Sequence, residues 1–491
     1  MRLKLYPVLG LSAALLTSAC AVGPNFQRPA APAIGGYTPA PLPRATAQAA
    51  TLGGEAQRFV DGADIPADWW TLFHSPALNA LVAAALKANP DLEAAKAGLR
   101  AARETYQAQR GALLPEVDAG YNVSRQQAST TLAPPLSSND DLFTLHTVQL
   151  TVSYAPDVFG GVRRQVESAR AQADAQRFQT EAVYLTVTAN VVAAAIQEAA
   201  LRDQVEATGK IIASIREVTG VMRRQLALGQ ISGADIAAQE TALAQAEQTL
   251  PPLEKQLAQQ RDLIADLTGH PSSQAPAERL DLAALTLPPD LPVSLPARLV
   301  EQRPDIRAAE ANLHSASAQV GVAIAARLPS LTLSANAGGS ATNIANLFSN
   351  GAGFWSVGAG LAQPIFQGGA LLHKQRAAEA SLDQAKAQYR SAVLAALQNV
   401  ADTLQALDAD ARALEAAAGA EQAAARSVAI ARRQLDLGQV GGPTVLAAEQ
   451  AYQQTVITLA QARAQRYADT AALFQALGGG WWNREEKYSL K

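Results

Sequence analysis

Cysteine is almost absent from this chain of 491 residues, because Cys20 is the only one. A single thiol excludes an internal disulfide, so the fold cannot rely on cross-links. Aromatic residues make up only 5% of the sequence, and the formal net charge is −3. So small a charge gives no field of the kind that binds nucleic acid. Much of the 48% hydrophobic content is alanine, which suits long helices in close contact better than a bulky globular core.

Long hydrophobic runs are also lacking. Residues 5–16 are apolar but too short to span a bilayer, and with Arg2 and Lys4 before them they predict an export signal. The signal ends at Cys20 in a motif similar to a bacterial lipoprotein cleavage site, which predicts lipid attachment there. Thr17 departs from the aliphatic residue usual in that motif, so an ordinary signal with a chance cysteine is the alternative. Ala21, where Asp would favour the inner membrane, indicates the outer membrane. No later segment has 18 apolar residues in a row, so no transmembrane helix is predicted.

The sequence does contain a long duplication. Asn89–Asp91 opens a helical pattern that ends at Pro115, and Arg303–Asp305 opens a matching pattern that ends at Pro329, 214 residues later at both ends. Two further motifs return in the same order: 154–161 as 362–369, and 223–230 as 432–439. Duplication on this scale predicts two copies of one structural unit.

Each copy contains two segments in which apolar and polar residues alternate with a period of two. In the first, Val117, Ala119, Tyr121 and Val123 alternate with polar or charged residues. Such segments have the length and period of transmembrane β-strands, although a soluble sheet with one wet face has the same pattern. The predicted strands are 116–126, 143–154, 330–340 and 353–363.

Proline-free helical stretches of 157–250 and 365–442 follow the strands. The first contains a helix of about 65 residues, roughly 100 Å long, which suits a structure that crosses the periplasm. Four strands cannot close a barrel, and an open sheet edge within lipid leaves backbone groups without hydrogen bonds. The chain is therefore expected to oligomerise. Two copies would give about eight strands with an interior filled by side chains, whereas a trimer would give twelve strands and leave a lumen.

These features together resemble the TolC-like outer-membrane efflux family, in particular its NodT-like lipoprotein branch. The resemblance covers about residues 20–480 and rests on Cys20–Phe26 with Arg28-Pro29, Trp69-Trp70, Asn89–Leu92, the Leu-Pro pairs before the strands and the duplicated Leu-Gly-Gln turns. It implies a trimer with a 12-stranded barrel, a periplasmic helical tunnel, docking to a periplasmic adaptor protein and, through it, to an inner-membrane efflux pump. The implied function is an exit duct that passes small molecules or drugs to the exterior.

In that family the two Leu-Gly-Gln turns are the tips of helical hairpins where the adaptor docks. Gly229 and Gly438 would permit the backbone reversal, and Gly233, Gly441 and Gly442 would loosen the next turn. Arginines lie in the last turn before each tip, where cations complement a helix C-terminus. Two ordinary helix corners with no partner are the alternative. The predicted docking residues are Leu228, Gly229, Gln230, Leu437, Gly438 and Gln439.

Asp235 follows the first tip, where family members often carry acidic residues near the closed periplasmic entrance. Three copies around one axis would influence cation preference, so Asp235 is a gate candidate. It could instead cap a helix that starts at Ile236. The second tip departs from the family pattern, because Ala447 stands where Asp is common and Glu449 is two residues out of register.

No catalytic residue, metal site or cofactor is predicted, because the five histidines are scattered and the Gly160-Gly161 and Gly368-Gly369 pairs lack the other residues of a phosphate loop. These glycines are expected to turn each strand into a helix. The main alternative to a duct is a lipid-anchored periplasmic coiled-coil scaffold or adaptor, which the four regular strands disfavour.

The predicted division of the chain is a lipoprotein signal (1–19), an extended arm (20–66), a first repeat (67–269), a Pro-rich linker (270–296), a second repeat (297–479) and a tail (480–491).

Overall fold

The structure is a computed structural model that describes residues 21–129, 131 and 140–484. The chain forms two compact units. The described part of the first unit is 21–29, Gly98–Gln176 and Ala309–Tyr389, and the second unit comprises 30–97, 177–308 and the described residues from Arg390. Each unit contains parts of both predicted repeats.

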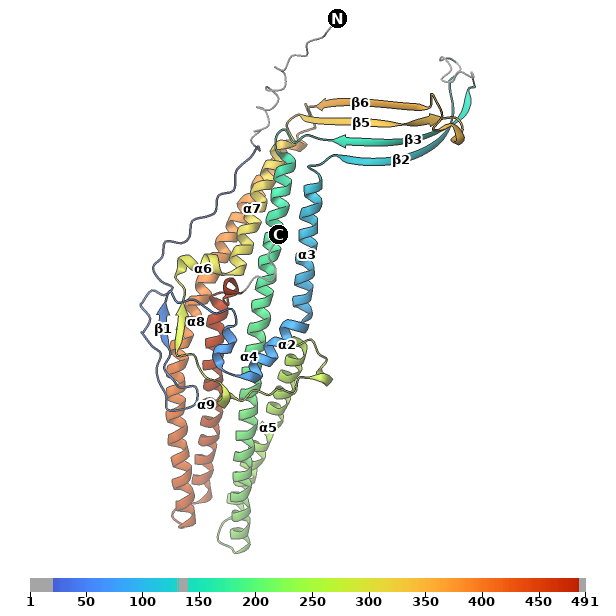
Figure 1. Cartoon of the computed structure of the whole chain (residues 1–491). Coiled ribbons are helices and arrows are strands. Elements are labelled where there is room, and N and C mark those ends of the chain that lie inside the picture. The colour runs from blue at the N-terminus through green and yellow to red at the C-terminus, as the bar shows by residue number, and fades with distance from the viewer. Residues whose placement is uncertain (1–20, 130, 132–139, 485–491) are drawn as a thin grey trace. The chain divides into compact units, whose positions relative to one another are not determined.

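The sequence duplication reappears as a repeated order of elements with nearly equal lengths (Figure 1). Each repeat has a 22-residue helix, two strands, a helix of 67 residues and a helix of 35 residues. The elements of the first repeat are α2 (Pro76–Ala88), α3 (Pro90–Gly111), β2 (Glu116–Gln127), β3 (Leu142–Tyr154), α4 (Gly161–Ala227) and α5 (Gly233–Leu267). Those of the second are α6 (Pro296–Gln302), α7 (Pro304–Ala325), β5 (Ser330–Ala341), β6 (Gly353–Ala362), α8 (Ala370–Asp436) and α9 (Gly442–Ala476).

The first unit is built around a four-stranded antiparallel sheet in the order β2-β3-β5-β6, in which the strands lie side by side (Figure 1). All four strands were predicted, and their ends differ from the prediction by one residue at most. The central β3–β5 pair joins the two repeats within one sheet.

The helical chain before α3 is itself divided in two. Residues Trp69–Phe73 form a 3-10 helix, η1, which ends at His74 in a left-handed conformation with φ 54°. The hydroxyl of Ser75 then accepts a hydrogen bond from the Leu78 amide at 3.3 Å and caps α2. This local cap is why α2 begins as a separate helix.

The core of the second unit contains a cluster of aromatic residues, although the sequence has few of them. Trp69 stacks on Phe474 with ring centroids 5.4 Å apart, and Phe73 lies 6.5 Å from Tyr467. All four side chains are fully buried. Elsewhere the helix contacts are made largely by alanine, valine and leucine, so that the helices pack closely with little bulk between them.

A second, two-stranded sheet was not predicted. The strands β1 (Arg58–Asp61) and β4 (Asp290–Val293) pair in parallel, and an ion pair between Arg58 and Asp290 at 2.8 Å lies across them. The prediction had placed these residues in the extended arm and the Pro-rich linker. The remaining short elements are 3-10 helices: η2 (Ser272–Gln274), η3 (Leu282–Ala284), η4 (Ile344–Asn346) and η5 (Trp481–Asn483).

Helix α4 includes an 18-residue stretch apolar enough for a membrane span, which the sequence reading had not found. Over half of that stretch (56%) is buried within the chain, as in the core helix of a soluble protein. Length and composition are therefore weak grounds for a spanning helix here.

Candidate functional site

The strand register of the sheet gathers most of the apolar residues of the four strands on one face. Val117 pairs with Val152, which pairs with Ala335, which pairs with Val357. One residue along each strand, Asp118, Thr151, Asn336 and Ser356 are paired in the same way on the opposite face. Further members of the apolar row are Ala119, Leu150, Ala337 and Trp355, and further members of the polar row are Glu116, Ser153, Ser334 and Gly358.

The apolar face is exposed in the single chain. Trp355, Val357 and Leu361 on β6 each expose about three quarters of their surface. A sheet with one exposed apolar face and one polar face is the pattern of a membrane barrel wall, with lipid on one side and an aqueous lumen on the other. Among the described residues, β2 and β6 each pair on one side only, so the sheet has two open edges.

Both hairpin tips adopt the same helix-ending geometry. At the first, the Gln230 amide donates to the Gln225 carbonyl at 2.9 Å and Gly229 has φ +71°. At the second, the Gln439 amide donates to the Gln434 carbonyl at 2.8 Å and Gly438 has φ +68°. This is the Schellman motif, in which a left-handed residue favours glycine.

The tips expose apolar side chains. Leu228 is 73% exposed and Leu437 is 61% exposed. The predicted tip residues therefore form two similar exposed turns. The role given to the later glycines was wrong, because Gly233 and Gly442 are the first residues of α5 and α9, and Gly441 is the N-cap of α9.

Asp235 is exposed and belongs to a capping box at the start of α5. The Ser232 hydroxyl accepts from the Asp235 amide at 3.2 Å, while the Asp235 carboxylate accepts from the Ser232 amide at 3.1 Å. The predicted alternative of a cap for a helix that starts at Ile236 was wrong in detail, since α5 starts at Gly233 and Ser232 is the N-cap. Hydrogen bonds from the side chain and backbone of Ser232 hold the pKa of Asp235 below its usual value.

Glu449 has a structural role that the sequence did not reveal. Its carboxylate is buried and forms an ion pair with Arg432 at 2.7 Å, and Arg432 also hydrogen-bonds the Ser214 hydroxyl. The equivalent pair in the first repeat is Arg223 with Glu240 at 2.8 Å, which is exposed. A cavity of about 380 Å³ adjoins the Arg432–Glu449 pair and is lined by residues of α4, α8 and α9, including Ile211, Ile215, Val428 and Tyr452.

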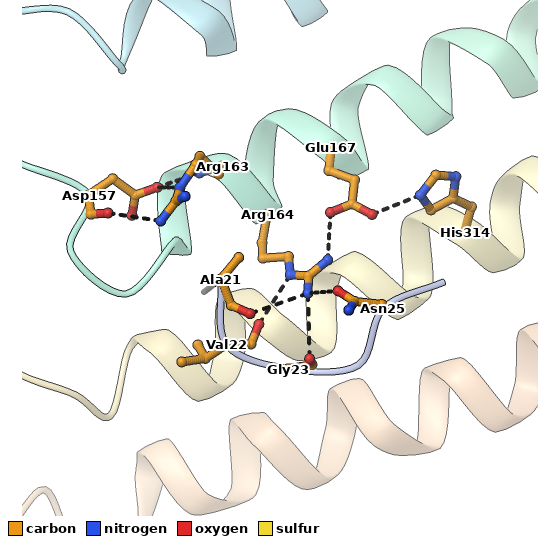
Figure 2. Close-up of polar contacts among 9 residues, drawn as sticks. All are labelled: Ala21, Val22, Gly23, Asn25, Asp157, Arg163, Arg164, Glu167 and His314. Carbon is orange, nitrogen blue, oxygen red and sulfur yellow. Dashed lines mark hydrogen bonds and ion pairs between the residues drawn. The ribbon is translucent and has the colours of Figure 1, made fainter. Parts of the chain in front are cut away.

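Residues that follow Cys20 are held by a buried arginine at the start of α4 (Figure 2). The Arg164 guanidinium donates from Nε to the Val22 carbonyl at 3.1 Å and from Nη2 to Asn25 Oδ1 at 2.6 Å. Its Nη1 donates to Glu167 at 2.7 Å, and His314 Nε2 lies 2.8 Å from the other Glu167 oxygen. Cys20 itself lies outside the described residues.

Glu167 stays ionised in this cluster. Burial raises the pKa of Glu167, but hydrogen bonds and positive charge from His314 and Arg164 outweigh it, and the pKa lies below its usual value. Sequence reasoning missed the cluster because 142 residues separate Val22 from Arg164. The one signal was that Arg163-Arg164 replaces the Leu371-Leu372 of the second repeat.

Within the part of the chain that the structure describes, no group of three or more His, Cys, Asp or Glu residues is placed to hold a metal ion.

Comparisons with known proteins agree with this geometry. The sequence model of the outer membrane efflux protein family matches residues 81–270 and 295–479. The pyoverdine export outer membrane protein OpmQ of Pseudomonas aeruginosa is 30% identical over 484 residues, which is 98% of each chain. OpmQ of Pseudomonas putida is 31% identical over 84% of this chain and 88% of its own length.

Solved structures of outer-membrane channels have a similar fold. The outer-membrane channel OprN is similar with a TM-score of 0.83 and 26% identity, over 94% of this chain and all of that one. The MtrE outer membrane channel of Neisseria gonorrhoeae, in its open state, has a TM-score of 0.78 and 25% identity over 94% of this chain and 99% of its own.

The long helical hairpins and the two-faced sheet define an outer-membrane channel, and the predicted fold class is confirmed. The chain belongs to the outer membrane efflux protein family. It is an outer-membrane transport protein for efflux, as the resemblance implied, and members of this family are channels rather than enzymes. The alternative of a periplasmic scaffold or adaptor is not supported.

Proposed function

We propose that three copies of this chain form a twelve-stranded barrel that serves, without catalysis, as the exit duct of a tripartite efflux system. The observation that carries the proposal is the register, which puts apolar residues of all four strands on one face and polar residues on the other. In lipid the open edges at β2 and β6 must pair, and pairing between copies satisfies them. Three copies leave an aqueous lumen lined by the polar face.

Crosslinking tests the assembly. Detergent-extracted protein treated with an amine-reactive crosslinker should give a ladder that stops at three subunits, and the trimer should form conducting pores in planar bilayers. A stable monomer with full secondary structure would contradict the barrel, because its edge strands would then tolerate lipid without partners.

The cargo is expected to be small organic molecules that arrive from a periplasmic adaptor and an inner-membrane pump. Support comes from relatives named for export of pyoverdine and efflux of toluene, and from the exposed leucines at both tips. Leu228→Asp with Leu437→Asp should abolish drug resistance conferred by the assembled system while trimer and pore remain. The matched control is Leu295→Asp, an exposed leucine in the predicted linker. Unchanged resistance in the double variant would exclude the tips as the docking site.

Cys20 is the proposed lipid attachment site and would become the first residue of the mature chain. Palmitate labelling of cells should mark the wild-type protein and not Cys20→Ser. Label on both proteins would show that the acyl chains are elsewhere. Pore formation should survive the substitution, because the barrel itself holds the protein in the membrane.

A further inference from the structure

The first residues after Cys20 are docked on the body of the first unit by hydrogen bonds, a ring contact and an ion pair. The Val22 amide donates to the Phe159 carbonyl at 3.0 Å, in the turn between β3 and α4. Phe26 stacks on His314 of α7 with ring centroids 4.3 Å apart, and Arg28 pairs with Glu310 at 3.1 Å. The segment 21–28 is therefore fixed along its whole length.

Arg164 is the centre of this docking (Figure 2). Its side chain is only 5% exposed, and a buried cation requires partners for its charge and its donors. Carbonyl oxygens of Ala21, Val22 and Gly23 converge on the guanidinium at 3.5, 3.1 and 3.5 Å. Only the fork of an arginine can serve so many acceptors at once, whereas a lysine is a single point of charge.

The fit around this segment is also tight. Gly23 has φ +92°, and a Cβ there would lie 2.5 Å from the Cα of Gly321 on α7. Both the conformation and the spacing therefore favour glycine at this position.

The duplication provides an internal comparison, because the second repeat has the same turn without the docking residues. The positions equivalent to Arg164 and Glu167 are Leu372 and Gln375, and the adjoining Ile365 and Phe366 are almost fully exposed. A chain has one N-terminal segment and two such turns. The cationic residue is present at the turn that the segment covers and absent from the other.

We propose that Arg164, with Glu167 and His314 behind it, forms a binding site for the chain's own N-terminal segment. Residues 21–25 are its ligand, recognised mainly through their backbone carbonyls, and Arg164 is a positioning residue. The N-terminus then has an anchor on the protein that is independent of lipid. Given the proposed acylation, the docked segment would also hold the acyl chains beside the β3–α4 turn, at the end of a barrel strand; that consequence rests on the proposed function.

The test uses the full chain with a single thiol. Cys20→Ser with Gln27→Cys places a nitroxide label on an exposed residue of the segment, and the spectrum of the purified protein in detergent reports its motion. In the parent protein, which carries only Cys20→Ser and Gln27→Cys, the label should be immobilised. Arg164→Leu, which introduces the residue of the second repeat, should raise the mobile fraction several-fold, and Arg164→Lys should lie in between. Arg170→Leu, an exposed arginine on the same helix, should leave the spectrum unchanged.

Gly23→Ala provides a second route, since it disturbs the docking without changing a charge and remains informative if Arg164→Leu does not fold. It too should mobilise the label. A folded Arg164→Leu protein with the parent spectrum, or a Gly23→Ala protein that stays immobilised, would overturn the proposal. Because Cys20 is absent from every protein in the series, failure of lipid attachment cannot produce either result.

Discussion

At the scale of single residues, the two repeats use one ion pair in two environments. Arg223 with Glu240 is exposed to solvent, whereas Glu449 is buried beneath Arg432. An exposed pair contributes at most about 1 kcal/mol. Loss of one partner from a buried pair leaves an uncompensated charge and costs roughly 3 kcal/mol. Removal of one partner should therefore destabilise the fold much more in the second repeat than in the first.

Arg432→Ala should lower the free energy of unfolding by roughly 3 kcal/mol, and Arg223→Ala by no more than about 1 kcal/mol. Denaturant titration of the two variants in the same detergent measures the difference. The double change Arg432→Ala with Glu449→Ala should recover part of the loss, because no buried charge then remains. Equal effects of the two single substitutions would show that burial is not what distinguishes the pairs.

Asp469 on α9 makes stability depend on pH. Burial, followed by the hydrogen bond and negative charge of Asp410 beside it, raises the pKa of Asp469 to about 7. A raised pKa in the folded chain means that this group favours folding fully below its unfolded pKa, and that the contribution is lost as pH rises through about 7.

Asp469→Asn should therefore melt at a temperature that depends less on pH. The difference in Tm between variant and wild type should move in favour of the variant as pH rises from 5 to 8. Asp402→Asn, at an exposed position on α8, is the control, and its Tm should depend on pH in the same way as that of the wild type. A Tm difference that stays constant over this range would show that Asp469 titrates normally.

At the scale of elements, the sheet register makes a sharp prediction for neighbouring residues. Val357 lies on the apolar face of β6 and Ser356 on the polar face. Val357→Arg puts a cation into lipid at a cost of about 2–4 kcal/mol near the bilayer centre. Ser356→Arg puts the same side chain into the lumen.

The amount of trimer in the outer-membrane fraction should fall sharply for Val357→Arg and stay near the wild-type level for Ser356→Arg. Ser356→Arg should instead change the conductance of the pore. If both proteins insert equally well, the apolar face does not contact lipid and the assignment of the two faces fails.

Element boundaries were predictable where local interactions define them. The strands were found from their period of two, and the tips from duplicated glycines, because both signals lie within a few residues of sequence. Helix α5 was harder, since it continues through Pro251 and Pro252 to Leu267. Both prolines are exposed, so water can satisfy the carbonyls that lose their intrahelical partners. Sequence reasoning alone would end the helix there.

At the scale of the whole molecule, the predicted gate role of Asp235 depends on assembly. In one chain it is an exposed member of a capping box, and three copies around an axis would form a ring of charge at the periplasmic entrance. Because its pKa lies below the usual value, the ring should stay ionised at neutral pH and lose its charge only in acid.

Asp235→Asn should reduce the cation selectivity of the trimer in planar bilayers at neutral pH. Wild-type selectivity should be constant from pH 5 to 8 and should decline only toward more acidic solution. Ala447→Asp, which supplies the acidic residue missing from the second tip, should strengthen selectivity. Identical selectivity of wild type and Asp235→Asn at every pH would leave Asp235 with capping as its one role.

The sequence by itself determined the duplication, the strands, the long helices, the two tips and the family, because each is written in local periodicity or in repeated motifs. Tertiary structure alone decided which charges are buried. Glu449 and Asp469 look like ordinary acidic residues in the sequence, and their environments come from helices far away in the chain. The same is true of β1 with β4, whose paired residues Arg58 and Asp290 are 232 positions apart. Arg164 is the clearest case, since its buried charge is matched by the carbonyl groups of a segment 142 residues earlier, and backbone carbonyls leave no trace in a sequence.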